Sequence, residues 1–147
     1  MVSVPGVDRP RIEGTPDGRR VVVDRVVAAP PDDVWTLLTD TERWPEWGPS
    51  VSDVRSEDRF VTEGTTGRVQ VVRGPWVPFA VDTCADYRWT WSVARIPATG
   101  HRVEPVEEGT RVAFEIPVVA AGYALVCRWA LDRIQRIAES ESESESG

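Results

Sequence analysis

Two side chains of this sequence could carry acid–base chemistry, His101 and Tyr123. His101 is the only histidine, and an imidazole changes charge near neutral pH, which suits a general acid or base. Because it alternates in phase with Val103, it should point to the same side as that apolar residue. The other interpretation is a packed histidine beside Gly100 with satisfied hydrogen bonds, since one unpartnered imidazole makes no catalytic constellation. The sequence favours the second interpretation and leaves the first open.

Tyr123 and the two cysteines are the other reactive candidates. The hydroxyl of Tyr123 could orient a polar group of a ligand, or the ring could simply pack. Cys84 or Cys127 could pair with His101 as nucleophile and base. We expect no such dyad, because alternation puts Cys84 on the solvent side of its strand and Cys127 is most simply a small core residue. The cysteine spacing does not fit a zinc site, and no glycine-rich phosphate loop is present, so we expect no metal and no cofactor.

The element best able to position these groups is a helix near the C-terminal end. Residues 118–138 carry apolar side chains at helical spacing, which predicts one amphipathic helix of about five turns. Its first half consists largely of small apolar residues, so we expect that half to be buried and to fill little space. The predicted inner stripe comprises Val119, Tyr123, Val126, Ala130, Ile134 and Ile137, flanked by Cys127 and Leu131.

Short β-branched and aromatic runs between turn signals predict an antiparallel sheet before this helix. A first strand at residues 20–29 is followed by two short helices, at 31–38 and 42–47, and then by strands at 51–57, 68–73, 77–85, 87–96, 101–106 and 110–116. Alternation puts Phe79, Val81, Trp89, Trp91, Val93, Val112, Phe114 and Ile116 on a dry face. The opposite face, with Asp82, Arg88 and Glu115, should be wet. The prediction is an α+β fold with a seven-stranded sheet.

The composition fits one domain and limits its partners. The 147 residues, 41% of them apolar, predict a loose lead-in at residues 1–18, a domain at 19–138 and a disordered acidic Glu-Ser tail at 139–147. The net charge of −7 argues against nucleic acid and anionic membranes as partners. The longest apolar run is too short for stable membrane insertion, and the N-terminus lacks a secretory pattern, so we expect a cytoplasmic protein. The absence of lysine would also fit a salt-rich cytoplasm, which stability measured in molar salt would test.

Two stretches carry a family resemblance: residues 29–51, APPDDVWTLLTDTERWPEWGPSV, and residues 107–116, EEGTRVAFEI. With the order of elements they resemble the START-like, or Bet v 1-like, superfamily, and more narrowly its polyketide cyclase/dehydrase and lipid-transport group. The resemblance covers residues 19–138. It implies a helix-grip fold, in which a curved seven-stranded sheet wraps around the long C-terminal helix and encloses a cavity for a small hydrophobic molecule.

The resemblance and the residue pattern together predict a domain that binds a small hydrophobic or aromatic molecule, lipid- or polyketide-like. The expected ligand contacts are Phe79, Val81, Trp89, Trp91, His101, Val112, Phe114, Tyr123, Val126, Cys127 and Ala130. Two alternatives stay open: a cyclase or dehydratase that uses the same cavity with His101 and Tyr123, and a domain whose groove accepts another protein. A void of about 300 Å³ or more would favour ligand binding. The sequence leaves catalysis and the oligomeric state open.

Overall fold

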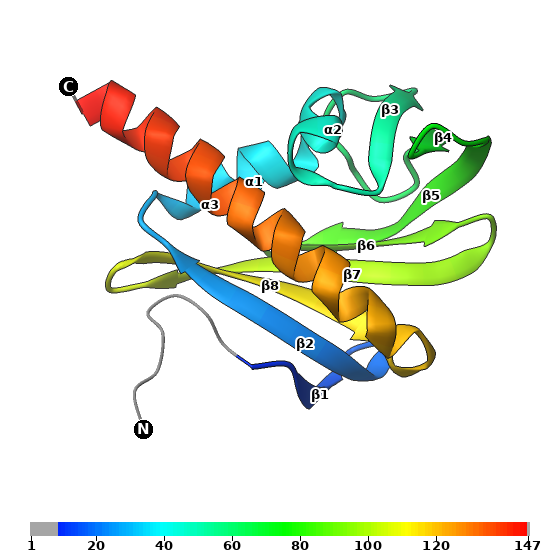
Figure 1. The fold of residues 1–147 in the computed structure, drawn as a ribbon, viewed down its shortest axis with the longest axis horizontal. Coiled ribbons are helices and arrows are strands. Elements are labelled where there is room, and N and C mark those ends of the chain that lie inside the picture. The colour runs from blue at the N-terminus through cyan, green and yellow to red at the C-terminus, as the bar shows by residue number, and fades with distance from the viewer. Residues whose placement is uncertain (1–8, 147) are drawn as a thin grey trace.

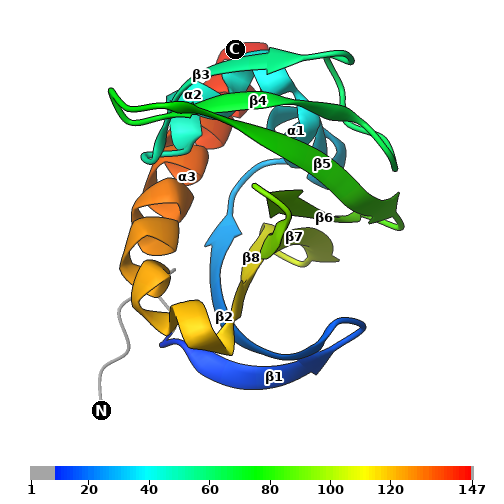
Figure 2. The same ribbon diagram turned by 90° about the vertical axis from the view of Figure 1, so that its right-hand side faces the viewer.

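The computed structural model describes residues 9–146 and has the predicted α+β architecture, an antiparallel sheet curved around one long helix (Figures 1 and 2). The strand order is β1-β2-β8-β7-β6-β5-β4-β3, with every neighbouring pair antiparallel. The strands are β1 (Arg11–Thr15), β2 (Gly18–Val27), β3 (Val51–Ser56), β4 (Thr66–Val71), β5 (Trp76–Ala85), β6 (Arg88–Val93), β7 (Ile96–Val106) and β8 (Gly109–Pro117).

The sheet has eight strands, so the predicted number of seven was wrong. The additional strand is β1, which the sequence analysis assigned to a loose lead-in at residues 1–18. β1 pairs with β2 along its whole length, and ion pairs fasten it from the side, because Arg11 contacts Asp24 and Glu13 contacts Arg102. Charged residues in a Pro- and Gly-rich segment gave no alternating apolar signal for this strand. Residues 1–8 of the lead-in lie outside the described part of the chain.

Two short helices connect β2 to β3, as predicted. α1 (Pro31–Thr39) begins at a proline in its first turn with Asp32 and Asp33 close behind, where carboxylates interact favourably with the helix dipole. A single 3₁₀ turn at Thr41–Arg43 follows, and the Asp40 carboxylate accepts a hydrogen bond from the Glu42 backbone N–H there. α2 (Trp44–Trp47) completes the connection. Its two tryptophans are buried and face the sheet.

The C-terminal helix differs from its prediction at both ends. Residues Val118–Tyr123 form a 3₁₀ segment, η2, with a non-helical Ala120, and none of these residues is buried. The expectation that the first half of the helix is buried was therefore wrong, and Val119 of the predicted inner stripe is 100% exposed. α3 runs over Ala124–Ser146 and lies across the concave face of the sheet (Figure 1). Its later stripe is in the core, where Cys127, Ala130, Leu131 and Ile134 are buried and Ile137 packs against them.

α3 continues through the Glu-Ser repeat that was predicted to be disordered. Glutamate is a good helix former, and two tail carboxylates reach the domain. Glu139 accepts a hydrogen bond of 2.9 Å from the Ala28 backbone N–H, and Glu141 forms an ion pair of 2.5 Å with Arg43. These contacts extend the helix beyond the predicted boundary at residue 138.

The convex face of the sheet is less wet than predicted. Glu115 and Thr90 are buried there. Glu115 accepts hydrogen bonds from Arg88 and Arg102, and those arginines also reach Asp17 and Glu13 beside and within β1. The added strand and its turn therefore cover part of a face that the strand pattern assigned to solvent.

One predicted turn was also misplaced. Residues 98–100 fall between the strands predicted at 87–96 and 101–106, where the chain was expected to turn, but they belong to β7. The chain reverses at Ala94 and Arg95, both with positive φ (52° and 66°). Neither is a glycine or asparagine, so this turn had no sequence signal.

Candidate functional site

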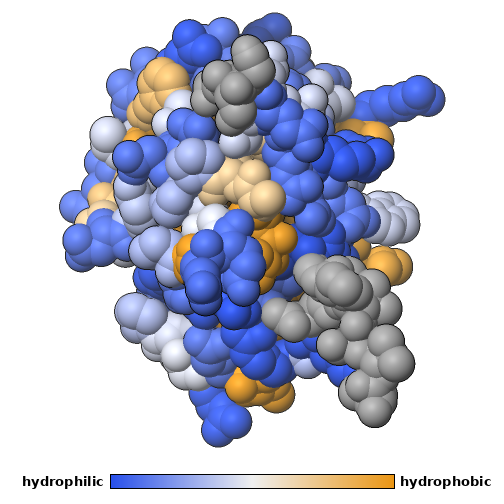
Figure 3. Space-filling view, turned by 90° about the vertical axis from the view of Figure 1, so that its left-hand side faces the viewer, coloured by the Kyte–Doolittle hydropathy of each residue, from blue (hydrophilic) through white to orange (hydrophobic). Residues whose placement is uncertain are grey.

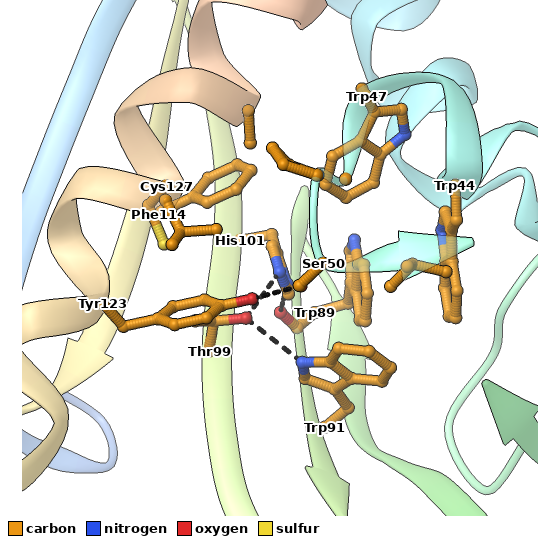
Figure 4. Close-up of a pocket in the computed structure, with 15 residues that line it drawn as sticks. Trp44, Trp47, Ser50, Trp89, Trp91, Thr99, His101, Phe114, Tyr123 and Cys127 are labelled. Atoms are coloured by element: carbon orange, nitrogen blue, oxygen red, sulfur yellow. Dashed lines mark hydrogen bonds between the residues drawn. The ribbon is translucent and has the colours of Figure 1, made fainter. Parts of the chain in front are cut away.

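A small cavity lies where α3, the segment after α2, and strands β6 to β8 meet (Figure 4). Its volume is about 40 Å³. We call it the inner cavity. Its walls are Trp44, Trp47, Gly48, Pro49, Ser50, Val51, Trp89, Trp91, Thr99, His101, Phe114, Tyr123, Val126, Cys127 and Ala130. The sheet side is a row of cross-strand neighbours, because Trp89 pairs with His101 and His101 pairs with Phe114.

Hydrogen bonds to α1 hold the tryptophans of α2 in the cavity wall. The Trp44 indole N–H donates to the Leu38 carbonyl (3.0 Å) and the Trp47 indole N–H donates to the Leu37 carbonyl (3.2 Å). These carbonyls lie in the last turn of α1, which has no intrahelical donors for them. The rings then stack on the sheet, with the Trp44 and Trp89 centroids 5.3 Å apart and the planes 3° from parallel. The same two tryptophans thus fasten α2 and form part of the cavity.

His101 lies in the wall with both ring nitrogens occupied. Its Nε2 is 2.9 Å from Thr99 Oγ1, and its Nδ1 is 3.3 Å from the Trp89 carbonyl oxygen. A carbonyl only accepts, so Nδ1 carries the proton and Nε2 accepts from the Thr99 hydroxyl. Thr99 Oγ1 in turn accepts from the Trp91 indole N–H at 3.1 Å. The chain Trp91 to Thr99 to His101 to Trp89 is complete, as the dashed lines of Figure 4 show in part.

The surroundings of His101 keep its imidazole neutral. Complete burial lowers the pKa of His101 from 6.5 to about 3, and the hydrogen bond to Trp89 opposes this only in part. Its ring stacks on Trp89 with centroids 3.9 Å apart and meets the Phe114 ring edge-on. A neutral ring without a free nitrogen does not act as an acid or base near neutral pH.

Cys127 shares the cavity with His101 but makes no reactive pair with it. Burial raises the pKa of the Cys127 thiol to about 12, so the thiol stays protonated. Cys84 is half-buried beside the Val61 carbonyl. It faces inward because the β5–β6 pairing shifts by one residue between Val81 and Thr83, which reverses the alternation assumed from the sequence.

Tyr123 lies at the outer edge of the inner cavity. Its hydroxyl is 2.5 Å from Ser50 Oγ (Figure 4), and burial raises the pKa of that hydroxyl above its usual value. The hydrogen bond joins the end of η2 to the segment between α2 and β3. Tyr123 and His101 do face the same void, which the sequence alone could not establish.

A larger apolar groove begins on the other side of this hydrogen bond. The groove has a volume of about 370 Å³. Ser50, Val51, Trp91, Thr99 and Tyr123 line both spaces. The remaining walls of the groove are Val69, Val71, Val93, Ile96, Pro97, Ala98, Ile116, Pro117 and Ala120. The outer groove thus has the volume expected of a small-molecule site, and the inner cavity does not.

Most of the predicted contact residues lie in the cavity wall. Those lining the inner cavity are Trp89, Trp91, His101, Phe114, Tyr123, Val126, Cys127 and Ala130. The other three residues predicted as ligand contacts, Phe79, Val81 and Val112, are packed in the core and line neither the inner cavity nor the outer groove. Phe79 contacts the rings of Trp44 and Trp91, which stand between it and the cavity.

Sequence reasoning missed the contribution of α2 and the segment after it. Trp44 and Trp47 lie in the short helix predicted at residues 42–47, and besides fastening that helix to α1 they line the cavity. The pair Gly48-Pro49, which ends α2, turns the chain so that Ser50 meets Tyr123. Thr99 was missed because it falls between the two strands predicted at 87–96 and 101–106, whereas it lies in β7. A polar residue alternating with His101 was the available signal for Thr99.

Within residues 9–146, no helix has the length and apolar content that crossing a bilayer requires. Across the same residues, no three side chains of metal-binding type come together. The groups that the inner cavity can present to a ligand are hydroxyls, one neutral imidazole, the thiol of Cys127 and aromatic faces.

Comparisons with known proteins agree with this architecture. A family model described as "Polyketide cyclase / dehydrase and lipid transport" matches residues 18–140. No curated protein matches the chain.

Several solved structures share the fold at low identity. A protein of Nitrosomonas europaea is 20% identical, with a TM-score of 0.62 over 82% of this chain and 94% of that one. A protein of Mycobacterium smegmatis is 16% identical, with a TM-score of 0.62 over 92% and 99%. The di-domain ARO/CYC StfQ from the steffimycin biosynthetic pathway is 16% identical, with a TM-score of 0.64 over 83% of this chain and 51% of that one.

Proposed function

Because the chain belongs to the polyketide cyclase/dehydrase and lipid-transport family, we propose that it binds a small, mainly apolar, ring-containing or acyl molecule between its sheet and α3. The observation that carries this proposal is the apolar groove of about 370 Å³ that meets the inner cavity at Tyr123. The ligand body occupies the outer groove, and one end points toward the Tyr123–Ser50 hydrogen bond.

The side chains of the groove support an apolar ligand with few polar groups. Val69, Val93 and Ile116 provide aliphatic surface, and Trp91 provides an aromatic face. At the boundary, the Tyr123 and Ser50 hydroxyls can donate to or accept from one polar group. A few polar groups in an apolar pocket orient a ligand, while the apolar surface supplies most of the binding energy.

The state of His101 supports binding over His101-dependent catalysis. A cyclase or dehydratase would need an acid and a base that exchange protons near neutral pH. The pKa of His101 is about 3 because of burial, and its nitrogens are engaged by Thr99 and Trp89. A cyclase role therefore has to rely on Tyr123 and the shape of the cavity. Unchanged turnover in His101→Gln, with any substrate found, would remove His101 from the mechanism.

A groove-filling substitution with a matched control tests the binding proposal. Ala120 lines the groove and is exposed, so Ala120→Trp should fold and occupy the space. Ala121 is the next residue, is also exposed and does not line the groove. The probe is the uncharged aromatic dye N-phenylnaphthylamine, and its binding is measured by fluorescence titration. Decanoate serves as a competitor with an acyl chain.

The expected result is that Ala120→Trp weakens dye binding by roughly tenfold, about 1.4 kcal/mol, and Ala121→Trp does not. Decanoate should displace the dye if acyl chains share the groove. Equal affinities of both variants and the unmodified protein would show that the dye binds elsewhere, and absence of binding by either compound would contradict the proposed function.

A further inference from the structure

Three turns of the chain surround the outer mouth of the groove. They are residues 71–75, which comprise the end of β4 and the β4–β5 turn, residues 94–98, which comprise the β6–β7 turn and the start of β7, and residues 117–123, which contain η2. Each contributes to the groove wall, through Val71, Ile96 and Ala120 respectively. All three lie at the same end of the molecule, on the right in Figure 1 and toward the viewer in Figure 2. We call these three segments the mouth rim.

The mouth rim presents aliphatic side chains to solvent. Val72 is 52% exposed, Ile96 is 67% exposed and Val119 is fully exposed, and Val71 and Val118 are exposed beside them. The opposite end of the molecule is mostly hydrophilic over the surface visible in Figure 3, with several separate apolar patches. Apolar side chains concentrated around a ligand mouth differ from the scattered exposed apolar residues that are normal on a protein surface.

The charge of the mouth rim is opposite to that of the chain. The whole sequence has a net charge of −7, but the three rim segments contain Arg73 and Arg95 and no acidic residue. Both arginines are exposed. The exposed aliphatic side chains and the neighbouring guanidinium groups together form a surface that is apolar and carries positive charge.

Two of the rim turns have residues with a left-handed backbone at their tips. Arg73, Ala94 and Arg95 have φ values of 51°, 52° and 66°. This left-handed region favours glycine or asparagine, so arginine and alanine there are disfavoured for the turn alone. The same conformation occurs outside the rim, at Asp86 and Tyr87 in the β5–β6 turn. The turns hold Arg73 beside Val72 and Arg95 beside Ile96 at their exposed tips.

We propose that the mouth rim docks on the surface of an anionic lipid bilayer. A bilayer accepts separate loop tips without a shaped complementary surface, so the aliphatic side chains can enter the acyl boundary. The guanidinium groups of Arg73 and Arg95 stay among the anionic headgroups. Docking of this kind is peripheral and places the groove mouth against the membrane. An apolar molecule can then pass between bilayer and groove without crossing water.

The net charge of the chain does not prevent this contact at physiological salt. Electrostatic interactions are screened over about 8 Å at that ionic strength, so only charges near the rim act on the headgroups. At very low salt the screening length grows several-fold and the acidic remainder of the chain is also repelled. Binding should therefore be strongest at intermediate salt and fall both below and above it.

Vesicle flotation with the full chain tests the proposal. The vesicles contain phosphatidylcholine alone or phosphatidylcholine mixed with phosphatidylglycerol. Two variants alter the rim, Ile96→Ser with Val119→Ser and Arg73→Gln with Arg95→Gln. Their matched controls alter exposed residues outside the rim, Ile12→Ser for the apolar change and Arg68→Gln with Arg136→Gln for the charge change.

The expected result is binding to the phosphatidylglycerol vesicles only, reduced roughly tenfold by either rim variant and unchanged in the controls. No binding to anionic vesicles, or equal loss in the control variants, would overturn the proposal. A dimer in analytical ultracentrifugation that Ile96→Ser with Val119→Ser dissociates would overturn it in favour of a second copy of the chain. Because flotation needs no ligand, failure here is distinguishable from failure of the dye titration.

Discussion

His101 is the residue at which the expected chemistry and the observed environment differ most clearly. A lone histidine facing a cavity suggests a general acid or base. Here it stacks on Trp89 and takes part in a complete chain of hydrogen bonds through Thr99. The histidine therefore orders the wall of the inner cavity, as the packed interpretation of the sequence favoured.

This role of His101 predicts a specific dependence of stability on pH. The pKa of His101 is about 3 in the folded state because of burial, against 6.5 for an unperturbed histidine. The unfolded chain binds a proton more readily, so the stabilisation is complete above pH 6.5 and is lost as pH falls toward 3. The slope for one such group is about 1.4 kcal/mol per pH unit.

The measurement is urea unfolding between pH 7 and 5, comparing the unmodified protein with His101→Gln. We expect the unmodified protein to lose stability more steeply, by about 1 kcal/mol between pH 6 and 5. Parallel pH profiles of the two proteins would contradict a buried neutral imidazole. Glu115 does not interfere in this window, because its arginine partners hold its pKa below the usual carboxyl range against the opposing effect of burial.

The position of Tyr123 at the boundary leads us to expect that its hydrogen bond slows ligand entry. Its hydrogen bond to Ser50 lies at the boundary between the outer groove and the inner cavity, where we expect it to hinder passage. Tyr123→Phe keeps the ring and removes the bond, whose net value is about 1 kcal/mol. We therefore expect dye association measured by stopped-flow fluorescence to accelerate by roughly fivefold. The control is the same substitution at the other tyrosine, Tyr87→Phe, which should not change the association rate. Acceleration in both variants would contradict a specific role of the Tyr123–Ser50 hydrogen bond in slowing ligand entry.

At the scale of elements, the sequence predicted those whose burial follows a regular period. The strands β5, β6 and β8 have their apolar residues at alternate positions, and the later part of α3 has an apolar stripe. The elements that were misjudged lack this regularity. β1 is held by charged side chains, and the β6–β7 turn uses Ala94 and Arg95 at positive φ.

The η2 segment is the most instructive of these errors. Small apolar residues such as Ala120 and Ala121 favour burial by composition, yet the segment is exposed and its helix is broken at Ala120. Composition cannot tell a buried helix start from a groove rim, because both are apolar. The distinction depends on how far the curved sheet reaches, which single-sequence patterns do not contain.

The ion pairs of Glu115 lead to a prediction about stability. They help to hold β1 to the sheet, because Arg102 contacts both Glu115 and Glu13 of β1. Its buried carboxylate joins Arg88 and Arg102, and Gly100 leaves the space it needs, since a Cβ there would lie 3.0 Å from Glu115 Oε1. Glu115→Gln leaves two guanidinium groups without their shared partner, which should cost about 3 kcal/mol. The exposed Glu104 also contacts Arg102, so Glu104→Gln removes the same charge and should cost less than about 1 kcal/mol.

Urea unfolding measures both stabilities, and hydrogen exchange of the β1 amides shows whether the strand loosens. Faster exchange in β1 is expected in Glu115→Gln alone. Similar stabilities of the two variants would mean that the buried network contributes no more than a surface ion pair.

For the whole molecule, the helix-grip fold could be predicted from the sequence, whereas the division of the site could not. The order of elements and the family resemblance led to a sheet clasping a long helix, and the structure has that arrangement. The inner cavity and the outer groove meet at a hydrogen bond between residues 73 positions apart, Ser50 and Tyr123. Contacts of this range leave no periodic trace in a single sequence.

The proposed binding site for an apolar ligand is the outer groove with its boundary to the inner cavity. The seven tryptophans of the chain report on this directly, because each indole N–H gives its own signal in a nitrogen–proton NMR spectrum. Trp91 lines both spaces and donates to Thr99 at their boundary. Trp76 and Trp129 line neither.

The most direct test is therefore a titration of the isotope-labelled protein with N-phenylnaphthylamine, following the assigned indole signals. We expect the indole signal of Trp91 to change most in chemical shift and that of Trp89 to change second most. The signals of Trp76 and Trp129 should not shift. Saturable binding that shifts Trp76 or Trp129 and leaves Trp91 unmoved would contradict it.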